Sequence, residues 1–164
     1  MKSLVVSYSY SGNTKKVAEI LSAYLRQNGE VQMLELAAED ESGTFLGQCR
    51  RAFWHQRARI VPVESDLSAY DIIAIGTPVW AFGPTPAVNA YLDACSGLAG
   101  KTVLLFTTYG GGAGNQRCLN YMQDILTAKG ALRFARFSIQ QLKVGDKEYV
   151  LEQILKATRL WPNG

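Results

Sequence analysis

Histidine and cysteine are scarce in this sequence, which limits the kinds of site that it can build. His55 is the only histidine in 164 residues, so a catalytic triad or a histidine-based metal cluster has almost nothing to work with. Cys49, Cys95 and Cys118 are odd in number, widely spaced and without a CxxC pair. Reduced, partly buried thiols of a cytoplasmic protein fit this usage best. We therefore expect neither a metal site nor a dedicated catalytic residue.

Long apolar runs and strong net charge are also missing. No apolar stretch approaches the length of a membrane span, and the run that begins at Leu4 breaks at Ser7. A net charge of +3 is too mild to indicate nucleic-acid binding. With 164 residues, 48% of them hydrophobic, the chain suits one core better than two. We expect a single domain over residues 1–164, either monomeric or dimeric.

The positive charge is nevertheless uneven. Arg50, Arg51, Arg57 and Arg59 lie close together in a run without a carboxylate, inside an irregular basic insertion of about residues 43–66. Such a run is most often a solvated face. Docking of an acidic partner protein or a phosphorylated substrate is the alternative.

Apolar runs and helical patterns alternate along the chain. Helical spacing follows every strand-like run except the second, after which the chain is irregular, and Val17, Ile20, Leu21 and Leu25 show it after the first. Several runs are continuously apolar, which is typical of strands buried on both faces. The pattern predicts an α/β fold, a doubly wound five-stranded parallel sheet in the order 2-1-3-4-5. The expected strands are residues 3–8, 31–36, 69–78, 101–108 and 131–139.

The loop between the first strand and the first helix suits a phosphate group. Unpaired backbone N–H groups at a helix start and nearby hydroxyl groups can bind an anion together. The same residues would also fit an ordinary turn in which Ser or Thr caps the helix. The candidate phosphate ligands are Ser9, Tyr10, Ser11, Gly12, Asn13 and Thr14.

Two further loops should lie beside it, because ligands of such sheets bind at the carboxyl ends of the strands where the strand order reverses. Residues 76–84 follow the third strand and residues 107–112 follow the fourth. Each loop places an aromatic residue, Trp80 or Tyr109, next to glycines. A flat apolar ring would fit between such walls. Alternatively, Trp80 packs its loop against the core.

Two motifs connect these loops with a known family. Ser9-x-Ser11-Gly12-Asn13-Thr14 resembles the phosphate loop of flavodoxins and related flavodoxin-fold proteins. Gly76-Thr77-Pro78-Val79-Trp80 resembles the isoalloxazine loop of flavodoxin-fold reductases, with Trp80 where flavodoxins place a stacking tryptophan. The resemblance implies FMN as cofactor, with its phosphate at residues 9–14. It implies a ring site formed by Pro78, Val79, Trp80, Phe82, Thr108, Tyr109, Gly110 and Gly111.

Three functions are compatible with this resemblance. The first is a flavodoxin-like electron carrier that passes electrons to a redox partner protein through non-covalent FMN. Carriers of this family are strongly acidic around the flavin, whereas residues 77–84 and 107–114 contain no carboxylate here. The second is an FMN-dependent NAD(P)H or quinone reductase, and the third, least favoured, is a flavin-free partner-binding module. The sequence alone does not separate the first two.

Overall fold

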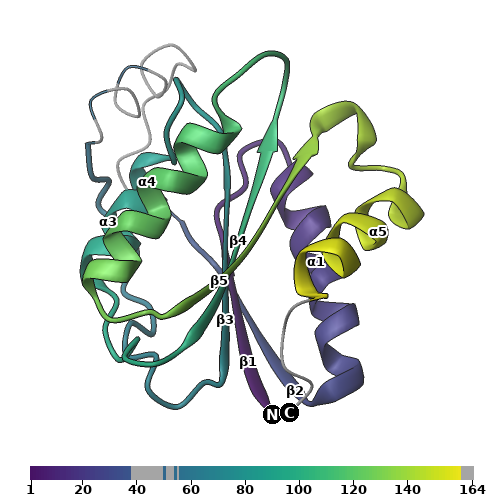
Figure 1. The fold of residues 1–164 in the computed structure, drawn as a ribbon. Helices are drawn as coiled ribbons and strands as arrows, with labels where there is room; N and C mark the ends of the chain where they lie inside the picture. Colours follow the sequence, from purple (N-terminus) through teal and green to yellow (C-terminus); the bar gives the residue numbers. More distant parts are fainter. Residues whose placement is uncertain (38–49, 51–53, 55, 160–164) are drawn as a thin grey trace.

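The structure of the protein, a computed structural model, describes residues 1–37, 50, 54 and 56–159. Within this part, five parallel strands form one sheet in the order β2-β1-β3-β4-β5, which confirms the predicted fold class (Figure 1). The strands are β1 (Lys2–Ser7), β2 (Glu30–Glu35), β3 (Ile72–Pro78), β4 (Thr102–Tyr109) and β5 (Arg133–Gln140). The helices are α1 (Asn13–Leu25), α3 (Pro86–Ala94), α4 (Asn115–Ala128) and α5 (Lys147–Thr158), with short 3-10 helices η1 (Arg26–Asn28) and η2 (Gln141–Lys143).

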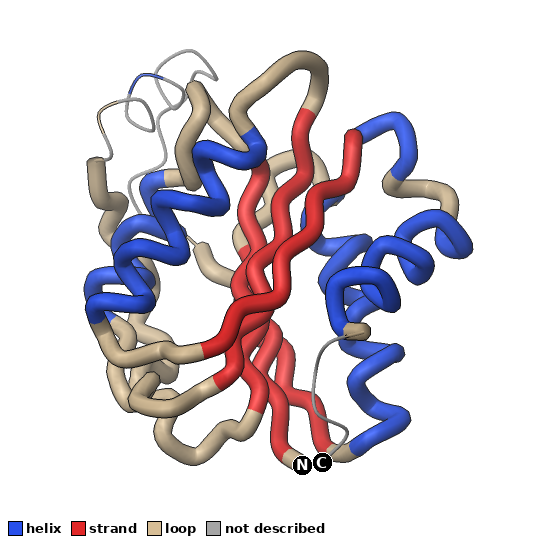
Figure 2. The backbone as a smooth tube through the Cα atoms, in the orientation of Figure 1, coloured by secondary structure: helices blue, strands red, loops and turns tan. Residues whose placement is uncertain are grey.

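Helices cover both faces of the sheet, as Figure 2 shows. Helices α1 and α5 lie on one face, where Val17 and Ile154 are buried in the same apolar cluster. Helices α3 and α4 cover the other face, and Tyr91 and Met122 are buried there. Because the strands are parallel and β1, β3 and β4 are neighbours, the carboxyl ends of these three strands lie side by side at the same end of the sheet.

The central strands form because their residues are apolar on both sides. Every residue of β3 is buried, and β4 pairs with it in register from Ile72–Thr102 to Pro78–Thr108. One glycine has a clear packing role: a Cβ at Gly76 would lie 2.1 Å from Cζ of Phe106. The central sheet therefore needs glycine at this position, two residues before β3 ends at Pro78.

Two helices are capped at their N-termini by side chains. Thr85 caps α3, its hydroxyl oxygen accepting a hydrogen bond from the Val88 N–H at 3.4 Å, and Pro86 occupies the first helical position. Asp146 caps α5 in the same way, with the Tyr149 N–H 3.0 Å from its carboxylate. Both helix starts are therefore fixed by side chains of the chain itself.

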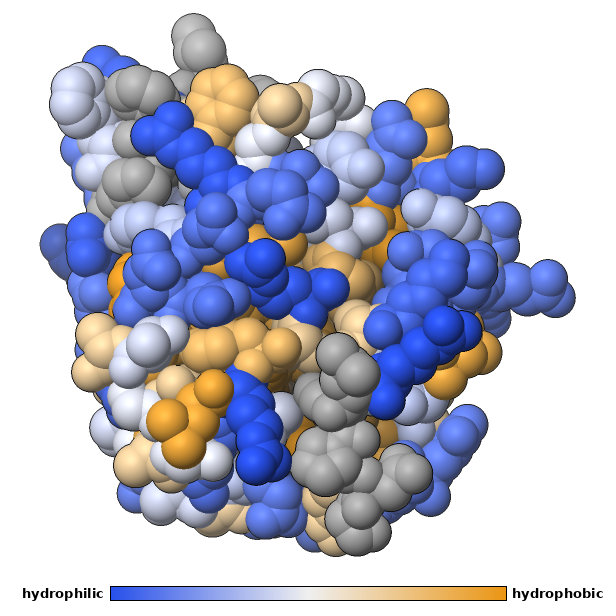
Figure 3. Space-filling model, in the orientation of Figure 1, coloured by the Kyte–Doolittle hydropathy of each residue, from blue (hydrophilic) through white to orange (hydrophobic). Residues whose placement is uncertain are grey.

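Much of the basic insertion predicted for residues 43–66 lies outside the described residues, as do His55, Cys49 and Arg51. Its described part is largely irregular. Cys95 and Cys118 are free and buried. Among the helices that the structure describes, none has the length and apolar character needed to cross a membrane. On the face seen in Figure 3, hydrophilic residues gather over α4 and α5, with apolar residues between them.

Candidate functional site

The loop between β1 and α1 has the geometry of an anion site. Gly12 occupies the N-cap position with φ at +83° and has no side chain to cap the helix. In the described part of the chain, the backbone N–H groups of Gly12, Asn13 and Thr14 have no hydrogen-bond acceptor. The first turn of α1 contains no acidic residue. Free N–H groups and the positive end of the helix dipole therefore face the same space.

Side chains order this loop internally. The Ser9 hydroxyl oxygen accepts a hydrogen bond from the Lys15 N–H at 3.2 Å, and the Asn13 amide donates to the Ser11 hydroxyl oxygen at 3.2 Å. The Thr14 side chain behaves differently, because it is buried and its hydroxyl oxygen lies 2.7 Å from that of Thr108. Thr14 thus presents its N–H to the anion space, while its hydroxyl group joins the loop to β4.

Two lysines follow this loop at the start of α1. The Lys15 ammonium group pairs with Glu35 at 2.8 Å, and this hydrogen bond raises the pKa of Lys15 above its ordinary value. Lys16 lies on the groove between α1 and α5. The loop therefore relies on backbone N–H groups and hydroxyl groups in this conformation.

The loop after β3 contains a tight turn at Trp80–Gly83. Trp80 and Gly83 exchange two backbone hydrogen bonds of 3.0 Å, and Ala81 and Phe82 between them have φ angles of +47° and +69°. Positive φ at both central residues is the property of type I′ turns, which glycine and asparagine normally fill. A bulky residue in this region is unusual and strained. At the base of the loop, the Thr85 N–H donates to the Thr77 hydroxyl oxygen at 3.1 Å.

The turn sends its two aromatic side chains in different directions. Trp80 is only 5% exposed, and its ring makes edge contacts with Tyr8 and Tyr10 at centroid distances of 5.9 and 5.5 Å. Phe82 is 48% exposed and lies against Gly114, where a Cβ would be 2.8 Å from its ring. The structure thus packs Trp80 beneath the loops, as in the alternative considered above. Phe82 is the aromatic residue at the surface.

A hollow of about 170 Å³ lies between this turn and the glycine-rich loop after β4. Gly110, Gly111 and Gly112 are exposed on one side of it, and at Gly111 a Cβ would meet nothing within 4 Å. The Val79 N–H donates to the Thr108 carbonyl oxygen at 2.8 Å, which holds the two loops together. The hollow is lined by Val79, Ala81, Phe82, Tyr109, Gly110, Gly111, Gly112, Ala113 and Asn115.

The predicted ring residues divide into two groups. Val79, Phe82, Tyr109, Gly110 and Gly111 meet at the hollow. The others do not line it: Pro78, Trp80 and Thr108 are buried or packed beneath.

Four residues of the hollow were missed by the sequence analysis: Ala81, Gly112, Ala113 and Asn115. Asn115 carried a usable signal, because it directly follows the glycine-rich loop and opens α4. Ala81 carried none, since its exposure to the hollow depends on the unusual turn.

The surroundings of the hollow are weakly charged. Among the described residues that line it, none is acidic or basic. Cys118 lies nearby in the first turn of α4, where burial raises the pKa of its thiol well above the ordinary value. The thiol therefore stays protonated and is a poor nucleophile. Within the described residues, no group of three or more metal-ligating side chains occurs.

The predicted arginine patch is only partly described. Arg57 forms an ion pair with Asp93 of α3, including a hydrogen bond of 3.1 Å from its guanidinium group. This contact attaches residues near Arg57 to the helical layer. Arg50 and Arg59 are exposed, and Arg51 lies outside the described residues. The pairing of Arg57 reduces what the patch can offer to an acidic partner.

Comparison with known proteins places this geometry in context. A family model described as NADPH-dependent FMN reductase matches residues 1–141 of the chain. No curated protein has a matching sequence.

Several solved structures are similar. A flavoprotein in complex with FMN from Lactobacillus acidophilus has a TM-score of 0.65 at 20% identity, with 90% of this chain and 98% of that chain covered. An NADH:FMN oxidoreductase in its apo form has a TM-score of 0.65 at 20% identity, covering 97% and 87%. Oxidised flavodoxin 1 from Bacillus cereus has a TM-score of 0.61 at 19% identity, covering 94% and 97%. At these identities the structures show a shared fold.

Proposed function

The chain belongs to the NADPH-dependent FMN reductase family, and from this premise we propose that it is an FMN-dependent reductase that oxidises NADPH. As a member of this family, the protein is an FMN-binding redox flavoprotein. One observation supports the proposed location of the cofactor site: the loops after β1, β3 and β4 meet at the carboxyl ends of these strands. Two hydrogen bonds join them there, Thr14 to Thr108 and Val79 to Thr108.

The residues at this edge fit the parts of FMN. The acceptor-free N–H groups of Gly12, Asn13 and Thr14 suit a phosphate dianion, and the absence of an acidic residue from the first helical turn leaves that charge unopposed. Phe82 and Tyr109 both line the hollow beside the glycines and offer it aromatic ring surface. Glycine allows backbone donors and acceptors to approach a planar ring closely.

The chain's own contribution is binding, orientation and control of water. When bound, FMN supplies the redox chemistry: it takes two electrons from a nicotinamide and passes them to an acceptor. The loop of residues 9–14 anchors the phosphate, while Phe82 and Tyr109 shield the ring from water. No proton has to be moved by a side chain of this site, which agrees with the absence of acidic and basic side chains from the described residues that line the hollow.

The uncharged hollow supports a reductase rather than a low-potential carrier. A carboxylate close to the ring would repel negative charge on the reduced cofactor and make reduction harder. No residue that lines the hollow is acidic. We therefore expect reduction by a nicotinamide to be favourable here. A flavodoxin-like carrier remains the second candidate, because its fold and FMN chemistry would be the same.

An anaerobic titration tests the choice between them. The FMN-loaded protein is mixed with NADPH or NADH in stoichiometric steps while the visible flavin absorbance is followed. A reductase should lose this absorbance at about one NADPH per flavin. Flavin that stays oxidised with both nucleotides, yet is bleached by dithionite, would contradict the reductase proposal and assign a carrier. Failure to retain FMN at all would contradict the cofactor site itself.

A further inference from the structure

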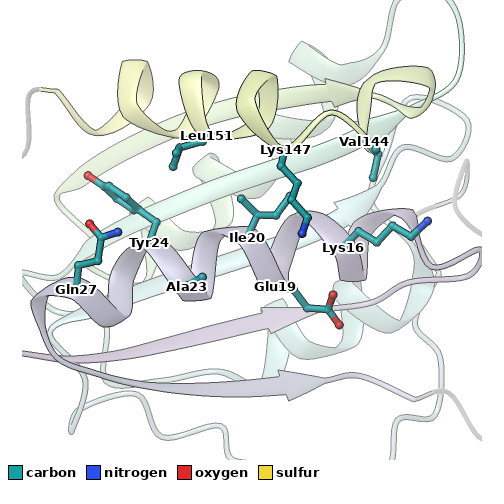
Figure 4. A pocket seen from close by; sticks show the side chains of 10 residues that line it. Lys16, Glu19, Ile20, Ala23, Tyr24, Gln27, Val144, Lys147 and Leu151 are labelled. Carbon is teal, nitrogen blue, oxygen red and sulfur yellow. The ribbon is translucent and has the colours of Figure 1, made fainter.

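A second concavity lies between α1 and α5, on the face of the sheet that these two helices cover. Its volume is about 630 Å³, within the range of small-molecule sites and larger than the hollow of about 170 Å³ beside the glycine-rich loop. Figure 4 shows side chains from α1 and α5 facing each other across it. We call it the α1/α5 groove. None of the residues proposed to hold FMN lines it.

The interior of the groove is apolar. Ile20 and Tyr24 of α1 are half-buried, and Val144 is 1% exposed. Leu151 of α5 completes the apolar wall and remains 37% exposed. The Tyr24 hydroxyl oxygen lies 3.1 Å from that of Thr158, which fixes the tyrosine ring against α5. The groove is therefore formed before any ligand arrives, with apolar surface left open to solvent.

One end of the groove carries positive charge. Lys16 of α1 and Lys147 of α5 both line it near Val144 (Figure 4). In the part of the chain that the structure describes, neither ammonium group has a carboxylate within 4.0 Å. Glu19 also lines the groove, but its carboxylate points away from α5. The rim thus presents two cations to whatever occupies the apolar interior.

We propose that the α1/α5 groove binds a small amphipathic carboxylate, that is, one carboxylate on an apolar chain or ring. The apolar body would lie against Ile20, Tyr24 and Leu151, and the carboxylate would sit between Lys16 and Lys147. Two lysines at the rim of an apolar interior, with the Glu19 carboxylate turned away from α5, favour an anion over a cation or a neutral molecule of the same shape. The inference rests on the groove alone and does not depend on the proposed reductase activity.

Helix α1 links this groove to the phosphate loop. The Lys16 N–H donates to the Gly12 carbonyl oxygen at 3.1 Å. Lys16, at the rim of the groove, therefore lies in the first helical turn after the phosphate loop. Experiments on the groove are therefore best made with FMN bound. Saturating FMN also keeps the apolar probe out of the flavin site.

Calorimetric titration of the FMN-loaded full chain with decanoate, below its micelle concentration, tests the proposal. Decyltrimethylammonium, which has the same apolar chain and the opposite charge, is the matched control ligand. We expect saturable binding of one decanoate per chain, and binding of the cationic control weaker by roughly tenfold or more. Absence of saturable decanoate binding, or equal binding of the two ligands, would overturn the proposal.

Variants locate the binding. Lys16→Glu together with Lys147→Glu should weaken decanoate binding by roughly tenfold or more, and Leu151→Glu should do the same by placing charge on the apolar wall. Arg133→Glu on β5 and Leu155→Glu on α5 are the controls, because both are exposed and neither lines the groove. Equal losses in the groove and control variants would contradict the assignment.

A second copy of the chain is the competing occupant. Sedimentation velocity of the parent chain and of Leu151→Glu distinguishes it from a small ligand. A dimer that dissociates in Leu151→Glu, combined with no binding of decanoate to either form, would show that the groove is a subunit interface and overturn the proposal.

Discussion

The hydroxyl oxygens of Thr14 and Thr108 lie 2.7 Å apart in the interior, although the two residues are separated by 94 positions in the sequence. Both side chains are buried. The bond joins the start of α1 to the end of β4, and so joins the proposed phosphate loop to the proposed ring loop. Buried hydroxyl groups that satisfy each other in this way are costly to separate.

Replacing one member of this pair should destabilise the apoprotein. In Thr14→Val the side-chain shape is kept, but the Thr108 hydroxyl group loses its partner, so we expect the free energy of unfolding to fall by about 1–3 kcal/mol. The double variant Thr14→Val with Thr108→Val removes both hydroxyl groups and should recover much of this loss. Urea unfolding of four proteins, namely the parent chain, Thr14→Val, Thr108→Val and the double variant, measures the difference. Additive losses would show that the two hydroxyl groups are not coupled.

A negative charge in the phosphate loop should discriminate between FMN and riboflavin. Ser11→Asp would place a carboxylate next to the acceptor-free N–H groups, so binding of the phosphate-bearing FMN should weaken strongly. Riboflavin, which has no phosphate, should lose much less affinity. Fluorescence titration of the apoprotein with both flavins measures this, and Ser96→Asp, an exposed serine after α3, is the control. Equal losses for both flavins would argue against a phosphate site here.

Phe82 should matter for flavin affinity more than for stability. Because its ring is 48% exposed at the hollow, Phe82→Ala should weaken FMN binding by about 1–3 kcal/mol, as lost aromatic stacking does elsewhere. The backbone φ angle of +69° at this position favours glycine. The free energy of unfolding should therefore be about 1 kcal/mol higher for Phe82→Gly than for Phe82→Ala. Unchanged FMN affinity in both variants would remove Phe82 from the site.

The Asp93–Arg57 pair should make a small contribution to stability that depends on pH. The hydrogen bond from Arg57 lowers the pKa of Asp93 below its ordinary value of 3.8. The ionised pair therefore stabilises the folded state above that ordinary value, and the contribution disappears as the pH falls through the lowered pKa. Because both side chains are about half exposed, Asp93→Asn should cost at most about 1 kcal/mol at neutral pH.

Urea unfolding of the parent chain and of Asp93→Asn at neutral pH and at about pH 2 checks this sign. A difference that grows in acid would contradict it. A loss well above 1 kcal/mol at neutral pH would indicate that the pair also holds the segment near Arg57 in place.

The parts of the fold that the sequence predicted are those with a local signal. The apolar runs that became β3 and β4 are continuous because both faces of these strands are covered, and their carboxyl ends locate the site by topology alone. Gly12 and the glycines after β4 likewise stand out in the sequence, because they lie in the loops that follow predicted strands. These features need no knowledge of distant contacts.

The orientation of the aromatic residues had no such signal. Nothing local indicates that Ala81 and Phe82 adopt positive φ, since neither is a residue that favours it. That turn buries Trp80 against Tyr8 and Tyr10 and turns Phe82 outward. The Thr14–Thr108 bond was equally hidden, because it depends on two loops that meet only in the folded chain. The site residues therefore remain predictions that the variants above can test.

Contacts between Tyr10 and Trp80, and between Val79 and Thr108, connect the same loops that the threonine pair joins. A binding site whose walls are already joined loses little chain entropy when a cofactor enters. The apoprotein and the FMN-loaded protein should consequently have nearly the same backbone conformation. The exchange of FMN between protein molecules would then be governed by the rate at which the cofactor leaves, with no refolding step in between.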